Sequence, residues 1–190
     1  MARPKAFAEQ DALHAAMETF WRKGYHQTSM QDLVDSMGIN RASLYDTFAD
    51  KHTLYKLTLE RYHDLNRADI AEAVAGMESA RAKIQTIFDR TVQETLDDHE
   101  RRGCFMTNAT LEMRPHYADV APIIERHFNY LGTLFRSLLY EAIEQQQCRA
   151  DLLVDETVAF LVSQLTGLRV LGKTNDPTLQ AIVAVTMSAL

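Results

Sequence analysis

The stretch that decides the fold is residues 24–55, which read GYHQTSMQDLVDSMGINRASLYDTFADKHTLY. Ser29 can cap a short helix, because Asp32 stands three residues further on as its capping-box partner. Gly38 can then adopt the left-handed conformation that a sharp turn needs. Asn40 can cap a second short helix. The pattern therefore predicts two short helices joined by a tight turn, which is the helix-turn-helix arrangement.

The outward face of the second short helix is the surface that could meet a nucleic acid. Leu44 and Phe48 lie one turn apart and would pack against the preceding helix. The side chains that then point away from the core can form hydrogen bonds, and a single helix fits the major groove of DNA. The alternative is a solvated helix face that binds nothing. The outward set consists of Asn40, Arg41, Ser43, Asp46 and Thr47, with Tyr45 at its flank.

Helical spacing recurs along nearly the whole chain outside this stretch. Met17 and Phe20 belong to an apolar stripe before it, and the residues from Ile124 to Ala142 repeat such a stripe over five turns. Neither period-2 alternation nor hairpin turn signals occur. We therefore predict an all-α protein of about nine helices. A three-helix helix-turn-helix domain would cover residues 1–56, and a helical domain would cover residues 57–190.

Composition narrows the class of protein further. The chain has 190 residues, is 46% hydrophobic and contains only two cysteines, so a disulfide scaffold is excluded and a reducing compartment is expected. The first ten residues lack the apolar segment of a signal peptide, and no apolar run is long enough to span a membrane. These observations predict a cytoplasmic protein with no membrane contact.

Motifs of catalysis and cofactor binding do not occur. The chain contains no GxGxxG, no glycine-rich phosphate loop, no HExxH and no GxSxG. The run from Asp97 to Glu100 carries atoms that can bind metal, but contiguous residues spread around a helix and do not converge. We interpret that run as a solvated helix end. The sequence predicts neither an enzyme nor a bound cofactor or metal.

Residues 24–55 resemble the DNA-binding region of TetR/AcrR-type bacterial repressors. The total length and the all-helical remainder are also similar to that family. The matching features are Phe20, Gly24-Tyr25, Thr28-Ser29-Met30, Leu33, Met37-Gly38-Ile39, Ser43-Leu44-Tyr45, Phe48, Lys51 and Leu54.

The resemblance implies a ligand-responsive transcriptional regulator, most simply a repressor that binds a palindromic operator as a homodimer. Arg41 suits guanine O6 and N7, and Lys51 suits a phosphate because it lies at a helix N-terminus. A dimer meets a physical need as well, since one short recognition helix reads only a few base pairs. The residues that the resemblance places on DNA are Thr28, Ser29, Arg41, Ser43, Tyr45, Thr47 and Lys51.

The last two helical segments predict the dimer interface. Residues 155–172 and 177–190 are apolar on more than one face, and such helices need two partners. Gly167 and Gly172 would let backbones approach closely. In the resembled family the last two helices form a four-helix interface with their copies. The alternative is full burial within one subunit.

The central part of the chain is the expected place for a small apolar or amphipathic effector, as in the resembled family. Small-ligand pockets are commonly apolar with a few polar groups. Each residue also has a simpler interpretation as part of the core. The expected lining consists of Phe88, Cys104, Asn108, Met113, His116, Tyr117, Phe128, Phe135 and Gln164.

Cys104 supports a second hypothesis about what the protein senses. It follows Arg101 and Arg102 and opens an expected helix, and both guanidiniums and helix N-termini stabilise a thiolate. Some TetR-like proteins with a Gly-Cys pair at this place sense oxidants or electrophiles, so a thiol-based repressor is one alternative. The other interpretation of Cys104 is a small buried hydrophobe. A further alternative for the whole protein is a dimeric ligand-binding protein without DNA binding.

The formal net charge of −6 is unevenly distributed. Residues 1–56 hold seven Lys and Arg against seven Asp and Glu, and residues 57–190 hold 13 against 19. The whole negative excess thus lies outside the expected DNA-binding head. Because the head is neutral, affinity would depend on few phosphate contacts, and we expect a moderate salt dependence of binding.

Asp46 departs from the resembled pattern, in which the residue after the Leu-Tyr pair is usually aromatic or polar. Its carboxylate could accept from cytosine N4 and read sequence, or it could simply repel phosphates. We expect an outward carboxylate with little net role, so Asp46→Ala should change binding little, and at most tighten it slightly and equally for all sequences, as simple repulsion would. Selection of bound sites from random DNA measures this, and a broadened sequence preference would instead show that Asp46 reads a base.

Overall fold

The computed structural model describes residues 3–174 and 177–190, with side chains from residue 9 onward. The described part of the chain is helical and contains no strand, which confirms the predicted all-α class. None of its helices is both long and apolar enough to cross a lipid bilayer. The elements are α1 (Arg3–Lys23), α2 (Met30–Met37), α3 (Arg41–Phe48), α4 (Lys51–Ala73), α5 (Ala80–Asp97), α6 (Phe105–Glu112), η1 (Ala118–Val120), α7 (Ala121–Glu144), α8 (Val154–Leu171), η2 (Gly172–Thr174) and α9 (Leu179–Ser188).

The chain folds into two compact units. The first unit contains the chain up to residue 66 together with residues 105–124, and the second contains residues 67–104 and 125–190. The first unit therefore includes α1, α2, α3, most of α4, α6 and η1. The predicted functional boundary after residue 56 stays a prediction, because packing alone does not define functional domains.

Aromatic side chains form the core of the first unit. Phe20 of α1 is fully buried, and its ring meets the edge of the Tyr55 ring on α4 at 5.0 Å. Phe105 of α6 packs edge-on against the same Tyr55 at 5.5 Å. Trp21 lies 5.2 Å from the Tyr62 ring and 6.3 Å from the Phe105 ring. The apolar stripe predicted for the first helix thus faces a shared aromatic core.

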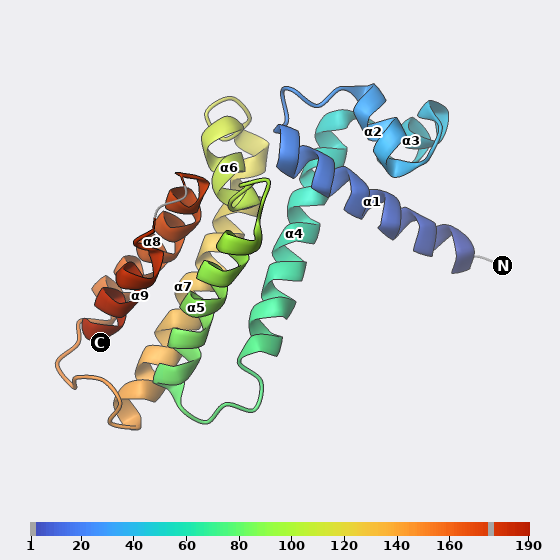
Figure 1. The fold of residues 1–190 in the computed structure, drawn as a ribbon. Helices are drawn as coiled ribbons and strands as arrows, with labels where there is room; N and C mark the ends of the chain where they lie inside the picture. The colour runs from blue at the N-terminus through green and yellow to red at the C-terminus, as the bar shows by residue number, and fades with distance from the viewer. Residues whose placement is uncertain (1–2, 175–176) are drawn as a thin grey trace. The chain divides into compact units, whose positions relative to one another are not determined.

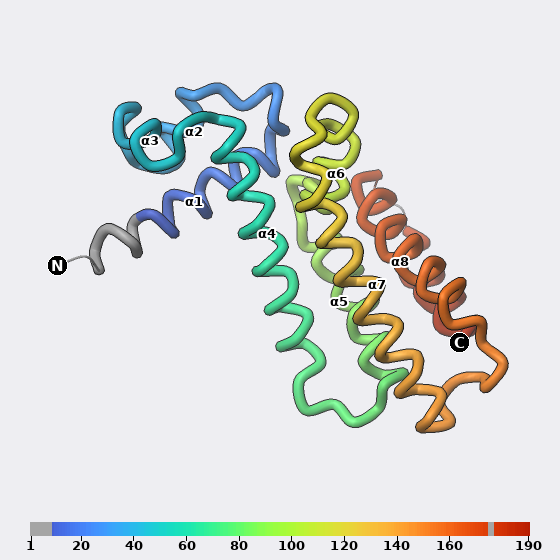
Figure 2. The backbone as a smooth tube through the Cα atoms, turned by 180° about the vertical axis from the view of Figure 1, so that it is seen from behind, coloured from blue at the N-terminus to red at the C-terminus, as the bar shows by residue number. Residues whose placement is uncertain are grey.

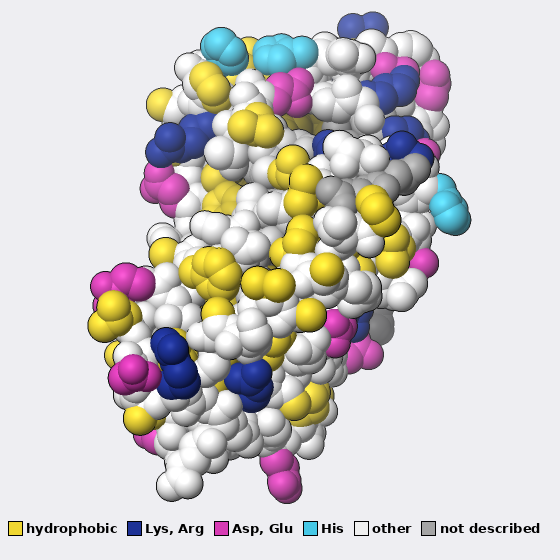
Figure 3. Space-filling view, turned by 60° about the vertical axis from the view of Figure 1, so that its left-hand side comes forward, with side chains coloured by type: hydrophobic (Ala, Val, Ile, Leu, Met, Phe, Trp, Pro, Cys, Tyr) yellow, Lys and Arg dark blue, Asp and Glu magenta, His cyan; other side chains and the backbone are white. Residues whose placement is uncertain are grey.

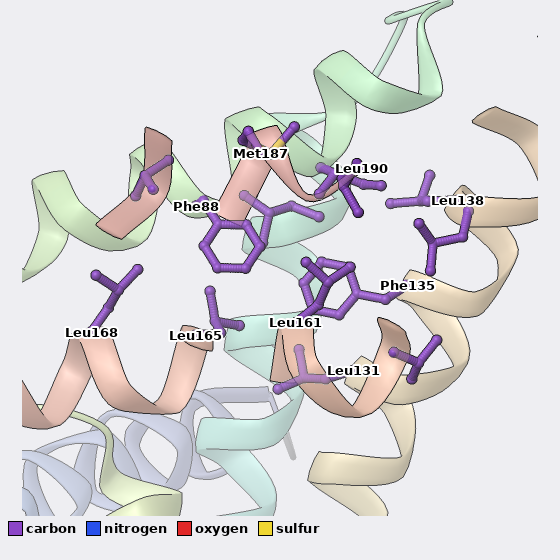
Figure 4. Close-up of a cluster of buried hydrophobic side chains, with 14 of the residues drawn as sticks. Phe88, Leu131, Phe135, Leu138, Leu161, Leu165, Leu168, Met187 and Leu190 are labelled. Atoms are coloured by element: carbon purple, nitrogen blue, oxygen red, sulfur yellow. The ribbon is translucent and has the colours of Figure 1, made fainter. Parts of the chain in front are cut away.

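The second unit is built on α5, α7, α8 and α9, which lie side by side (Figures 1 and 2). Their apolar stripes meet in one cluster (Figure 4). Phe88 of α5 stacks on Phe135 of α7 with a ring separation of 5.8 Å. Leu161 and Leu168 of α8 are fully buried in the same cluster. Burial of one face of each helix accounts for the stability of this bundle.

A glycine lets η2 approach α5 closely. Gly172 is buried, and a Cβ at this position would overlap the side-chain methyl of Thr95. At Gly167, by contrast, a Cβ would have no described atom within 4 Å. The close approach expected from the sequence therefore occurs within the chain at Gly172.

We expect Gly172→Ala to lower the free energy of unfolding by about 1–3 kcal/mol, because the added methyl must displace the side chain of Thr95. Urea denaturation followed by circular dichroism measures the change. The matched control is Gly132→Ala on α7, where the new Cβ would meet Val158 at an ordinary 3.7 Å. The control should leave stability unchanged or raise it by about 0.5–1 kcal/mol. Equal effects of the two substitutions would contradict the close approach.

Candidate nucleic-acid interface

The start of α2 carries the predicted capping box. Ser29 Oγ accepts a hydrogen bond from the backbone N–H of Asp32 at 3.1 Å, and the Asp32 carboxylate accepts one from the Ser29 N–H at 2.8 Å. Lys23 also donates to this carboxylate at 2.6 Å. The hydrogen bonds from Lys23 and Ser29 hold the pKa of Asp32 well below its usual range. The side chains of Ser29, Asp32 and Lys23 therefore fix the start of α2.

The turn and the second short helix also follow the predicted local pattern. Gly38 adopts the left-handed conformation at φ 65°, and its N–H donates to the Val34 carbonyl. Asn40 Oδ1 accepts from the Ser43 N–H at 2.8 Å and caps α3. Leu33 and Leu44 are fully buried, so α2 and α3 turn their apolar faces inward. These observations confirm the helix-turn-helix.

Helix α3 presents a polar surface to solvent. Leu44 and Phe48 are buried, and Ser43 is half-buried. The Arg41 guanidinium lies 5.9 Å from the ring centre of Tyr45, which is 42% exposed. Hydrogen-bonding groups and one aromatic ring are thus available on the exposed surface of this helix. The exposed residues of α3 are Arg41, Ala42, Tyr45, Asp46 and Thr47.

Thr28 and Ser29 lie in different environments although they are adjacent. Thr28 is only 1% exposed, and its hydroxyl donates to the Gly24 carbonyl at 2.6 Å. Ser29 is exposed while it caps α2. The side chain of Thr28 therefore holds the turn before α2, whereas Ser29 lies at the surface beside the start of that helix.

Lys51 stands at the first position of α4, directly after Asp50, whose carboxylate accepts from the Thr53 N–H at 2.7 Å. This bond caps the start of α4. The Lys51 ammonium lies 4.4 Å from the centre of the Tyr25 ring. Burial lowers the pKa of Lys51, and the carboxylates of Glu112 and Asp32 oppose this effect. The ring restricts where this cation can lie.

Three side chains that the sequence pattern did not single out meet within the first unit. Asp119 of η1 accepts hydrogen bonds from Lys56 Nζ at 2.9 Å and from His52 Nε2 at 2.9 Å. The bonds from Lys56 and His52 lower the pKa of Asp119 to about 2. The partners are 63 and 67 residues apart in sequence, so no local signal could have revealed the contact. These hydrogen bonds hold η1 against the first turns of α4.

The residues predicted to line an effector site fall into both units. Phe88 and Phe135 stack in the core of the second unit, and Met113 is fully buried in the first. His116 is exposed. The effector-binding role of the set stays a prediction. The first unit holds Asn108, Met113, His116 and Tyr117, and the second holds Phe88, Cys104, Phe128, Phe135 and Gln164.

Cys104 lies at the end of a loop that Asp98 organises. The Asp98 carboxylate accepts from the Arg102 backbone N–H at 2.5 Å and from the Arg102 guanidinium at 3.0 Å. Cys104 itself is 6% exposed. Burial favours the interpretation as a small hydrophobe, since reactive thiols are usually partly exposed. Within the described residues, no group of three or more His, Cys, Asp or Glu side chains is arranged to hold a metal ion.

Two family models match the chain. The model of bacterial regulatory proteins of the tetR family matches residues 12–57, and the model of the tetracyclin repressor-like C-terminal domain matches residues 80–184. The chain therefore belongs to the TetR family of helix-turn-helix transcriptional regulators. This is a family of DNA-binding regulators and not of enzymes.

Individual relatives are similar over most of their length. The chain is 32% identical to the HTH-type transcriptional regulator YezE of Bacillus subtilis (strain 168), covering 80% of this chain and 78% of YezE. It is 31% identical to the transcriptional repressor ComR of Escherichia coli (strain K12), covering 79% and 70%. A cysteine mutant of the TetR-family regulator CifR, solved with 26-bp double-strand operator DNA, is 29% identical with a TM-score of 0.79, covering 94% and 93%.

Proposed function

We propose that this protein is a ligand-responsive repressor that binds a palindromic operator as a homodimer and leaves it when a small effector binds. The observation that carries the proposal is the surface of α3, where hydrogen-bonding side chains stand outward on a helix that is capped and packed from behind. ComR, a relative of similar length, is a repressor, which supports repression over activation. A regulator of this kind acts in the cytoplasm, where its operator lies.

The proposed contacts on DNA divide into two kinds. Arg41, Ser43 and Thr47 on α3 are suited to base edges in the major groove. Tyr45 and Lys51 are suited to phosphates, Lys51 because its ammonium lies at the N-terminus of α4. Ser29, which is exposed at the start of α2, is also suited to a phosphate contact. Thr28 would act through the turn that it holds, since its side chain is buried.

The proposed dimer uses the outward faces of α8 and α9. Phe160 and Val170 on α8 are 36% and 45% exposed, and Val185 on α9 is 66% exposed. Small residues accompany Val185 on its helix, including the exposed Ala181. Figure 3 views the molecule from the side where α8 and α9 lie, and apolar side chains gather across its middle. An apolar surface on two adjacent helices supports pairing with a second copy.

The proposed effector is a small apolar or amphipathic molecule bound in the second unit. A hollow of about 310 Å³ lies there between the end of α5, residues 98–101 and the start of α9, and none of the residues that the sequence predicts to line an effector site borders it. Leu96 and Leu179 give it apolar walls, and His99 and Arg101 give it polar ones. This combination is typical of sites that bind small amphipathic ligands.

Lys51→Met tests the proposed DNA contact. We expect weaker binding to every DNA sequence, because a phosphate contact carries no sequence information. The slope of log K against log salt should fall by about 0.9 for each phosphate that is no longer neutralised, hence by about 1.8 for a dimer. Fluorescence anisotropy on DNA from the region upstream of the protein's own gene provides both numbers.

The control for Lys51 is Arg149→Met, which removes one positive charge from an exposed side chain of the second unit. It should leave the slope unchanged. Failure of the wild-type protein to bind any upstream or selected sequence would favour the alternative of a ligand-binding protein without DNA binding.

Val185→Glu tests the proposed dimer. A carboxylate placed in an apolar interface has no partner there, so we expect dissociation to a chain of 21.6 kDa and a loss of operator affinity. Sedimentation equilibrium measures the mass. Leu65→Glu on α4, where the leucine is 42% exposed, is the matched control and should stay dimeric. A dimeric Val185→Glu variant would place the interface elsewhere.

A further inference from the structure

The last residue of α6 reaches back to the end of α1. The Glu112 carboxylate accepts hydrogen bonds from two consecutive backbone N–H groups, that of Tyr25 at 3.0 Å and that of His26 at 2.9 Å. Both groups belong to the turn that joins α1 to α2. Hydrogen bonds to a charged acceptor are stronger than those between neutral groups. One side chain thus holds a backbone segment 86 and 87 residues earlier in the sequence.

Gly24 makes room for this carboxylate. Its φ is +80°, and its N–H donates to the Phe20 carbonyl at 2.8 Å, so it ends α1 in the left-handed conformation. A Cβ at this position would lie 3.0 Å from the nearer carboxylate oxygen of Glu112. The carboxylate therefore lies directly against the backbone of the turn, where a larger residue would press on it.

The turn held by Glu112 leads to the proposed DNA contacts in two directions. Along the chain, the Thr28 hydroxyl bonds to the Gly24 carbonyl, and Ser29 follows as the cap of α2. Across the fold, the buried ring of Tyr25 lies 4.4 Å beneath the Lys51 ammonium. The Tyr25 backbone, together with the Tyr55 and Tyr117 rings packed against this side chain, thus restricts where the ring and the cation over it can lie.

We propose that Glu112 is a positioning residue for operator binding: its carboxylate fixes the turn at residues 24–28 and, through the Tyr25 ring, holds Lys51 where a phosphate is bound. The proposal rests on the proposed function, because it assigns to Glu112 a role in the same DNA contact. Glu112 itself touches no DNA in this scheme.

The direction in which Kd changes when Glu112 is replaced distinguishes positioning from direct charge repulsion. A carboxylate near a DNA-binding lysine repels phosphates, so its neutralisation alone would tighten binding. Removal of the positioning bonds has the opposite effect, because the lysine and the turn are no longer held for the phosphate. Weaker binding after removal of this negative charge therefore cannot come from relief of direct repulsion between Glu112 and the phosphates.

The experiment compares three variants on the operator that the wild-type protein binds. We expect Glu112→Leu to raise Kd about tenfold, since leucine cannot accept either charge-assisted hydrogen bond. Glu112→Gln should have a Kd between those of the wild type and Glu112→Leu, because its amide oxygen still accepts a hydrogen bond from the turn but carries no charge. Glu72→Gln removes the same charge from an exposed carboxylate of α4 and should leave Kd within about twofold.

A double-mutant cycle locates the effect. In a Lys51→Met background, Glu112→Leu should raise Kd by a smaller factor than in the wild-type background, because the cation is absent and only the turn before α2 is left to be displaced. In the wild-type background it should also lower the salt slope, as Lys51→Met does. Purely additive effects, or a folded Glu112 variant that binds as tightly as wild type, would overturn the proposal. If wild-type protein binds no DNA, the proposed function itself fails, which is a separate result.

Trp21 provides the folding control. It is the only tryptophan of the chain, and its ring lies 6.3 Å from that of Phe105 at the start of α6. Unchanged Trp21 emission with weakened operator binding indicates that α6 is still packed and only the turn has moved. If Glu112→Leu alters this emission, the comparison of Glu112→Gln with Glu72→Gln decides, because glutamine preserves the shape of the side chain.

Discussion

Helices of eight residues do not persist in water by themselves, and the surface proposed to read DNA consists of two of them. Formation of the first turn of a helix costs free energy, and a short helix adds too few further hydrogen bonds to offset that cost. Helices α2 and α3 therefore depend on what they bury, above all on Leu33 and Leu44, which are fully excluded from solvent. Helix α1 packs against α2, and α2 packs against α3, so these contacts provide the framework for that burial. The polar surface of α3 keeps its geometry only while α1 and α2 hold their positions.

Local sequence was sufficient to predict the parts of this head that short-range physics determines. The cap at Ser29, the left-handed Gly38 and the cap at Asn40 each involve residues within four positions of one another, and all three are confirmed. The inward direction of Leu44 follows from helical spacing alone. These contacts are predictable because a helix end leaves the same backbone groups without partners wherever it occurs.

Contacts between residues far apart in the sequence could not be predicted from it, and the reason is again physical. Glu112 bonds to a turn 86 and 87 residues earlier, and Asp119 bonds to His52 across 67 residues. Nothing in the local pattern of α6 distinguishes Glu112 from a solvated carboxylate. Thr28 shows the converse case, because its place in the motif suggests a surface residue while its hydroxyl is buried on the Gly24 carbonyl. Pattern resemblance identifies such positions but does not tell which side chains face outward.

Net charge is a poor guide to DNA binding in this protein because its carboxylates have different uses. The Asp32 carboxylate is neutralised by Lys23, and Glu112 is held by two backbone N–H groups. Asp119 is similarly paired with Lys56. A formal count treats these three groups as repelling DNA, whereas each one orders part of the unit that contains α3. Asp46 remains exposed on the proposed DNA-binding face.

The path of the chain gives the carboxylates of residues 105–124 a further importance. The chain passes between the two units at three places, within α4, between Cys104 and Phe105, and between Ile124 and Glu125. Two of these passages bound the segment that carries Glu112 and Asp119. The effector proposed for the second unit would strain this segment from both of its ends, and its two carboxylates hold the α1–α2 turn and the start of α4. A small displacement there would therefore act first on the supports of α2 and α3.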